Sequence, residues 1–133
     1  MQTAIKEVHR SIFKALTSYA PLMEKVTGVL DGVNETQGFP YIEIGEPTIN
    51  PWNTKNTIGE NIVFVLHTWS KYPGYSETYD VMNLIYAAMT EQPLTMLGGF
   101  SVKKIESESK NAFKDIDGKT RHGVMNFRVY VNN

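Results

Sequence analysis

Residues 115–131 read DIDGKTRHGVMNFRVYV, a polar turn followed by a segment in which apolar and polar side chains alternate. Side chains of consecutive strand residues point to opposite faces of a sheet. One face of this strand would therefore carry Met125, Phe127, Val129 and Val131, and the other Asn126, Arg128 and Tyr130. The pattern predicts a half-buried strand that enters its sheet from a tight turn.

The turn resembles the first residues of a calcium-binding loop, because Asp115 and Asp117 are two positions apart and Gly118 follows. A complete loop needs a third oxygen ligand two residues later and a glutamate at its twelfth position. Those positions hold Lys119 and Asn126. We therefore interpret the segment as a β-turn built on Asp and Gly, and we expect no metal site.

Three upstream segments complete the predicted sheet. The apolar run at 62–66, extending to Trp69, is β-branched and aromatic and apolar on both faces, which is typical of a central strand. Residues 41–45 place Ile42 and Ile44 on one face, and prolines follow at 47 and 51. Residues 100–109 alternate charged side chains, which suits an exposed edge strand or a protruding hairpin.

Helices are predicted at both ends of this set. Apolar residues recur every three or four positions over residues 3–19, and a short helical turn follows at 21–26. A second long helix would begin with Ser76 as its cap and end before Pro93. Its apolar stripe would consist of Tyr79, Met82, either Ile85 or Tyr86, and Met89.

The predicted order is helix, strand, strand, helix, strand, strand. It indicates an α+β fold, with an antiparallel four-stranded sheet and two helices packed on one face. Residues 50–60 are rich in Asn, Thr, Pro and Gly without periodicity, so we expect a long loop after the first strand. A length of 133 residues is that of one domain, residues 1–133.

Composition excludes several classes of function. The net charge is −1 without a basic stripe that could neutralise a phosphate backbone, so we expect no sequence-independent nucleic-acid binding. The sequence lacks cysteine, a signal-peptide pattern and an apolar run of membrane-spanning length, which predicts synthesis in the cytoplasm and no membrane association. The fold must therefore be held by its apolar core.

The histidines are the residues to weigh for catalysis. His67 and Trp69 are two apart in a strand and share a face, which could form the floor of a small-ligand pocket or be a histidine packed beside an indole. His122 precedes the last strand, where bonding a backbone group would explain it. A small hydrolase or isomerase with His67 or His122 as base has no identifiable partner residue. We expect no enzyme activity and no cofactor.

Aromatic and charged residues in the connecting segments are the candidates for protein contacts. Tryptophan and tyrosine are enriched in interface hot spots, because they bury a large area at a small entropy cost. Trp52 in the long loop either binds a partner or folds back over the sheet. The full set of predicted interface residues is Trp52, Asn53, Lys55, Tyr72, Tyr75, Lys103, Lys110, Asp117 and Arg121.

Three groups of residues together resemble one protein family. They are Phe39-Pro40-Tyr41-Ile42-Glu43-Ile44-Gly45-Glu46, then His67-Thr68-Trp69-Ser70 with Gly74 and Glu77, and finally the segment from Asp117-Gly118 to Arg128. In these features the chain resembles the small tail-completion and tail-to-head joining proteins of long-tailed bacteriophages. The motifs are structural, so the resemblance implies a place in an assembly and no reaction.

The resemblance implies a non-catalytic virion protein at the head-proximal end of the tail tube. Six copies would form a ring that completes the tail and joins it to the head connector, with subunits that can be monomers beforehand. Its partners would be its own copies, the tail tube protein and the head connector or stopper protein, and genomic DNA would pass through without specific binding. The alternatives are a head-side connector, a minor tail protein, or a ligand-binding module on the His67/Trp69 face.

Overall fold

Two long strands form the centre of the molecule in the computed structural model, which describes residues 3–33 and 35–132. Strands β4 (Gly59–Ser70) and β6 (Arg121–Asn132) are antiparallel and pair along their whole length. Their side chains alternate between a buried face and a half-buried face. The alternation predicted for residues 125–131 is confirmed, since Met125, Phe127, Val129 and Val131 are all buried.

Four further strands extend this pair into a six-stranded sheet of order β1-β2-β4-β6-β5, with β3 also on β4. β2 (Tyr41–Ile44) and β3 (Thr48–Pro51) both run antiparallel to β4, at its two ends. β5 (Ser101–Lys114) is antiparallel to β6 and forms one edge of the sheet. β1 (Val29–Leu30) lies parallel to β2 at the other edge.

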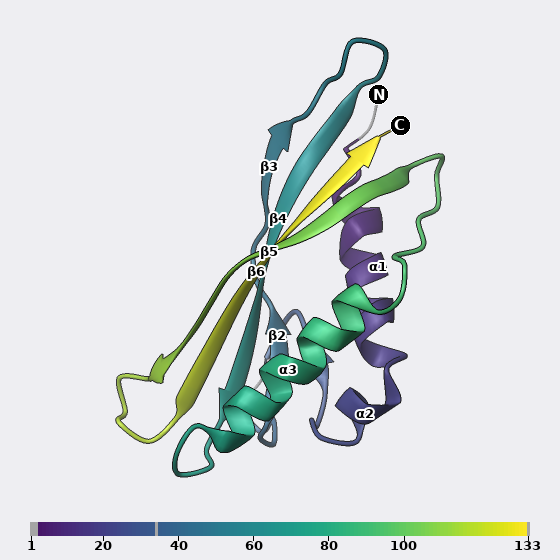
Figure 1. Ribbon diagram of the computed structural model, residues 1–133. Coiled ribbons are helices and arrows are strands. Elements are labelled where there is room, and N and C mark those ends of the chain that lie inside the picture. The colour runs from purple at the N-terminus through teal and green to yellow at the C-terminus, as the bar shows by residue number, and fades with distance from the viewer. Residues whose placement is uncertain (1–2, 34, 133) are drawn as a thin grey trace.

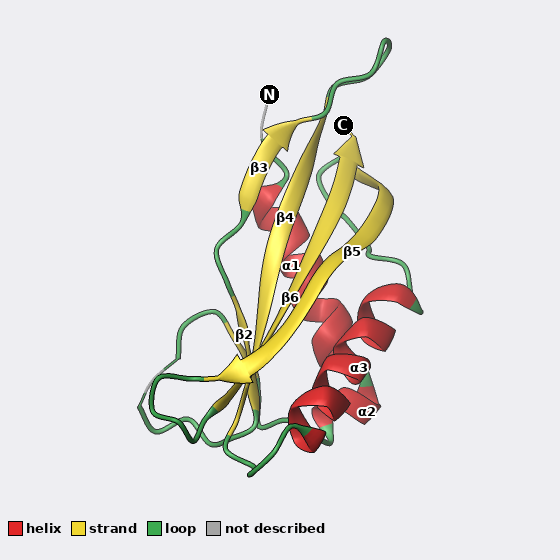
Figure 2. Ribbon diagram, turned by 60° about the vertical axis from the view of Figure 1, so that its left-hand side comes forward, coloured by secondary structure: helices red, strands yellow, loops and turns green. Residues whose placement is uncertain are grey.

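The helices in the described part of the chain cover a single face of this sheet, as Figure 2 shows. They are α1 (Ile5–Thr17), α2 (Ala20–Met23) and α3 (Ser76–Thr90). The core lies between the two layers, with Phe64 and Phe127 of the sheet wholly buried against residues such as Ile85 of α3. Among residues 3–33 and 35–132, no helix covers the opposite face of the sheet. No helix in the described part of the chain is both long and apolar enough to cross a lipid bilayer.

The start of α1 is held by a residue distant in sequence. The carboxylate of Glu60 accepts hydrogen bonds from the backbone N–H of Ala4 at 2.7 Å and from the hydroxyl of Thr3 at 3.0 Å. A carboxylate at this position satisfies amide hydrogens that a helix leaves free and interacts favourably with the helix dipole. The start of α1 is thereby fixed to the beginning of β4.

The α+β class, the antiparallel pairing of β2, β4, β6 and β5, and the central place of β4 agree with the sequence-based expectation. The prediction of a purely antiparallel four-stranded sheet is wrong, because the sheet has six strands and is mixed. Strand β1 has only two residues, too few for a periodic signal. Only Ile49 of β3 packs against the core, and Pro51 ends this edge strand, where proline is tolerated.

The long loop after the first strand is consequently shorter than expected. Residues 48–51 and 59–60 belong to strands, and only residues 52–58 connect β3 to β4. Ser76 was expected to cap the second helix, but it is the first helical residue, and no side chain caps this end. In α3 the structure selects Ile85 for the buried stripe; Tyr79 and Tyr86 are exposed. The strand expected at 100–109 continues to Lys114.

Candidate functional site and assembly surfaces

The β5–β6 hairpin projects beyond the helical layer, at the lower left of Figure 1. Its turn is organised by Asp117, whose carboxylate accepts bonds from the backbone N–H groups of Lys119 and Thr120, both at 2.8 Å. Its second oxygen accepts a bond from the Thr120 hydroxyl at 2.6 Å. These bonds lower the pKa of Asp117 to about 2. Gly118 adopts a φ of 70°, so the β-turn expected from Asp and Gly is confirmed.

Four rings gather on the uncovered face of the sheet, near the base of this hairpin. We call this group the ring cluster; it consists of His67, Trp69, Phe113 and His122. Trp69 stacks on His122 with centroids 3.8 Å apart, and Phe113 meets His122 edge-on at 4.9 Å. Nδ1 of His67 lies 2.7 Å from Nε2 of His122, so the two imidazoles share a hydrogen bond. Burial is the main cause that lowers the pKa of both histidines.

The ring cluster corrects the interpretation of His122. It was expected in the turn, bonded to the backbone, but it lies in β6 directly opposite Trp69 of β4. The rings cover each other's faces instead of forming the floor of an open pocket, which agrees with a histidine packed beside an indole at His67. Glu43 accepts a bond from Nε1 of Trp69 at 3.1 Å. Sequence spacing could not reveal the cluster, because it depends on the register between β4 and β6.

The other half of the uncovered face carries a polar network. Arg128 bonds through its guanidinium to Glu108 of β5 and to Asn61 of β4, which connects three strands. Beside it, the ammonium group of Lys104 lies 4.5 Å from the centre of the Tyr130 ring. Each exposed ion pair or cation–π contact is worth about 1 kcal/mol or less, so these contacts orient side chains more than they stabilise the fold.

The predicted contact residues of the β3–β4 connection divide between sheet and solvent. Trp52 is half-buried and packs edge-on against Tyr130 with ring centroids 5.0 Å apart. Of its two interpretations, partner binding or folding back over the sheet, the structure therefore agrees with the second. The side chain of Asn53 accepts a bond from the Gly59 N–H at 3.2 Å. Lys55, in the same connection, is exposed to solvent.

The remaining predicted contact residues lie on different surfaces. Tyr72 is exposed at 52%, whereas Tyr75 stacks on Tyr79 at 5.6 Å and is covered by the guanidinium of Arg121 at 5.1 Å. Lys103 is exposed on the edge strand. The ammonium group of Lys110 lies over the ring of Tyr86, on the helical side of the sheet. These residues therefore do not form one site.

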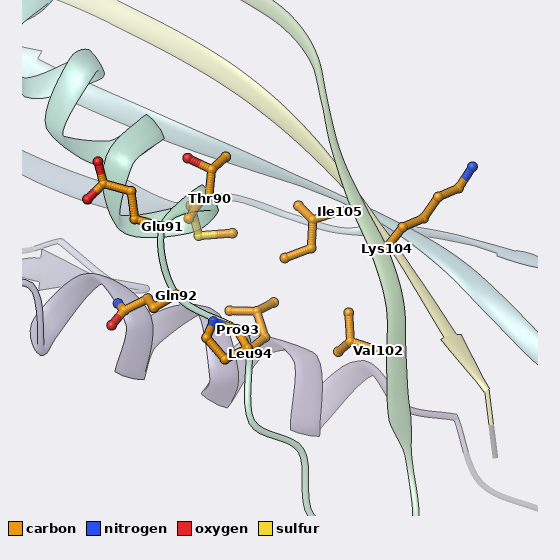
Figure 3. Close-up of a pocket in the computed structure, with 9 residues that line it drawn as sticks. Thr90, Glu91, Gln92, Pro93, Leu94, Val102, Lys104 and Ile105 are labelled. Atoms are coloured by element: carbon orange, nitrogen blue, oxygen red, sulfur yellow. The ribbon is translucent and has the colours of Figure 1, made fainter.

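Two grooves complete the description of the surface. The first, of about 440 Å³, lies between the end of α3 and β5, with Leu94, Val102 and Ile105 facing it (Figure 3). The second, also of about 440 Å³, lies between α1 and β1 and is lined by Lys6, His9, Arg10, Phe13, Val29, Leu30 and Asp31. Neither was expected from the sequence, since each forms only where a helical segment packs beside a strand.

Comparison with known proteins gives the family. The sequence model of the family described as tail completion protein gp17 matches residues 10–132. The chain belongs to this family. A relative described as tail completion protein gp17 of Bacillus phage SPP1 is 32% identical over 130 residues, which are 98% of this chain and 96% of the relative.

Two solved structures share the fold. The structure of bacteriophage SPP1 gp17 superposes with a TM-score of 0.68 at 32% identity and covers 98% of this chain and 92% of that chain. A chain from the virion of a native gene transfer agent particle has a TM-score of 0.86 at 15% identity and full coverage of both chains, which shows the fold alone. The resemblance to phage tail-completion proteins is confirmed, and this gp17-family chain is a structural protein of a phage tail.

Proposed function

We propose that this gp17-family protein forms a ring of six copies at the head-proximal end of the tail tube, completes the tail there and joins it to the head connector. The observation that carries the proposal is the position of the two hairpins. The β3–β4 connection and the β5–β6 turn lie at opposite ends of the long central strands (Figure 1). Twelve residues of antiparallel strand span roughly 40 Å, so one subunit can contact structures above and below its ring.

Ring formation also agrees with the two different edges of the sheet. Strand β5 is a long edge strand, and β1 at the opposite edge is short and lies beside α1. A subunit with two unlike edges pairs head to tail with its neighbour, and such contacts close into rings when the rotation between copies allows it. The subunits would be made in the host cytoplasm as single-domain monomers, and the tail end would then act as the template for the ring.

The tail tube protein and the head connector or stopper protein are the partners that this position implies. Genomic DNA would pass through the ring without being held. A net charge of −1 suits this role, because strong phosphate binding requires a cluster of basic side chains.

The test is electron microscopy of lysates from phage that carry a stop codon in this gene. Full heads beside unattached tails are expected, and restoring the gene from a plasmid should restore joined particles. Tails of normal length would favour joining, and overlong tails would favour termination of the tube. Intact, normally joined virions from the stop-codon phage would refute the proposal.

A further inference from the structure

The tip of the β5–β6 hairpin presents an apolar side chain to solvent. Ile116 has a relative exposure of 101%, the largest of the exposed apolar residues. It lies between two carboxylates, those of Asp115 and Asp117. The bonds within the turn lower the pKa of Asp117 to about 2, so this carboxylate stays charged even in mild acid. A fully exposed isoleucine at a projecting turn offers apolar surface that a partner can bury.

The groove between α1 and β1 has the complementary character. Phe13, Val29 and Leu30 provide its apolar lining, and the exposed cations Lys6 and Arg10 stand beside it on α1. Phe13 is itself 42% exposed, so its ring offers apolar surface at the groove.

Two carboxylates are close to these residues, Asp31 in the groove lining and Glu7 on α1, and each already has a partner. Asp31 lies 3.7 Å from Nε2 of His9, and Glu7 pairs with Arg10 one helical turn away. The hydrogen bond from Arg10 is the main cause that lowers the pKa of Glu7, and the nearby charge of Lys6 adds a smaller contribution. The groove is thus apolar within and cationic along its α1 side.

These two features lie at opposite edges of one sheet. The groove adjoins β1 and the hairpin contains β5, and the sheet order places β1 and β5 at the two ends. In Figure 1 the hairpin extends to the lower left, while α1 lies on the right. The tip therefore cannot reach the groove of its own chain, whereas the tip of a neighbouring copy can, in the head-to-tail manner that closes a ring.

We infer that the hairpin tip of one copy docks in the α1–β1 groove of the next, with Ile116 against Phe13 and Leu30, and with Asp115 beside Arg10 and Lys6. The inference rests on the proposed ring and names the contact that closes it. Apolar burial supplies the affinity, and the charges select the register and exclude tip-to-tip contacts, since like charges repel.

Cysteine cross-linking tests this contact directly, because the natural chain contains no cysteine. Virions are produced by stop-codon phage in cells that supply the double variant Phe13→Cys with Ile116→Cys, and are then oxidised mildly. A disulfide forms only when the two β-carbons are about 3.5–4.5 Å apart. A ladder of covalent oligomers is expected on non-reducing gels, and the ladder should disappear on reduction.

The matched control pairs Ile116→Cys with Tyr86→Cys. Tyr86 is 43% exposed, almost the same as Phe13, but it lies on α3 away from the groove. This control should yield at most traces of linked chains, as should each single-cysteine variant. A ladder from the control pair, or no ladder from the Phe13 pair in virions that contain the protein, would overturn the inference. If Ile116 instead meets the tube or connector protein, the Phe13 pair will cross-link to no second copy, which also refutes the docking contact.

Substitution of the tip separates this inference from the proposed function. Ile116→Asp should leave the isolated subunit folded, because the side chain is fully exposed there, and should weaken each contact roughly ten- to hundredfold. Ile116→Val should retain most joined particles. If Ile116→Asp supports wild-type yields while the stop-codon phage fails to join heads to tails, the docking inference is refuted and the joining function stands. If the stop-codon phage joins normally, the proposed function itself fails.

Discussion

Replacing Gly123 by alanine tests the contact that holds α3 against the sheet at the base of the projecting hairpin. Gly123 is buried in β6, next to His122. A β-carbon built at this position would lie 2.8 Å from Sδ of Met82 and 3.1 Å from Cγ2 of Thr78, both on α3. Ordinary contacts between such atoms are about 3.5–4.0 Å, so at least one side chain must move.

The size of the effect follows from which neighbour can move. Met82 is flexible and can adopt another rotamer, whereas Thr78 is β-branched and wholly buried. Overpacking of a core destabilises a protein by about 1–3 kcal/mol. Replacing glycine by alanine also lowers the conformational entropy of the unfolded chain, which stabilises the folded protein by about 0.4–1 kcal/mol. We expect a net loss of about 1–2 kcal/mol. For a chain of 133 residues this corresponds to a fall of roughly 4–7 °C in Tm.

The assay is urea unfolding of the purified subunit, with Gly32→Ala as the matched control. A β-carbon at Gly32 meets nothing within 4 Å, so the control should be as stable as the parent or slightly more so. Combining Gly123→Ala with Met82→Ala should show a favourable coupling of about 0.5 kcal/mol or more, because the shortened side chain removes the clash. A Gly123→Ala protein as stable as the parent would refute the close approach of α3 to β6.

Three further predictions concern single side chains. Thr78→Val should raise stability by about 1 kcal/mol, because the buried Thr78 hydroxyl bonds no other described residue; a lower urea midpoint would contradict this. The pKa values of His67 and His122 are lower in the folded protein than in the unfolded chain. The free energy of unfolding should therefore be highest above pH ~6.5 and should decrease as the pH falls, because the unfolded chain then binds more protons than the folded protein. His122→Gln should flatten that slope between pH ~7.5 and ~5, and an unchanged slope would exclude the pair as its source. Trp52→Ala should stay folded, losing about 1 kcal/mol with its Tyr130 contact, and lower the yield of joined virions; undiminished yields would count against an assembly role.

The apolar pattern of the chain is sufficient to predict its main elements. Alternation at residues 125–131 predicts the buried face of β6, and the apolar run at 62–66 predicts the central strand. The three- and four-residue spacing of apolar side chains predicts α1, whose buried residues include Val8, Ile12 and Leu16. These features are local, because the period of a helix or strand is set by its own backbone geometry.

Short and polar strands are beyond the reach of that pattern. The pairing of β1 with β2 and of β3 with β4 is made by backbone hydrogen bonds, which any residue except proline can donate. The start of α1 is held by Glu60, which accepts a bond from Ala4, 56 positions away. No window of sequence contains both members of such a pair.

Local sequence patterns are thus enough for the α+β class, the order of the main elements and a family resemblance that the comparisons confirm. Which side chains meet is settled by the tertiary fold alone. It stacks Trp69 on His122, lays Trp52 on Tyr130, and places the Ile116 tip and the Phe13 groove at opposite edges of the sheet. The physical reason is that surfaces for assembly arise from strand register and sheet order, which depend on contacts between segments far apart in the chain.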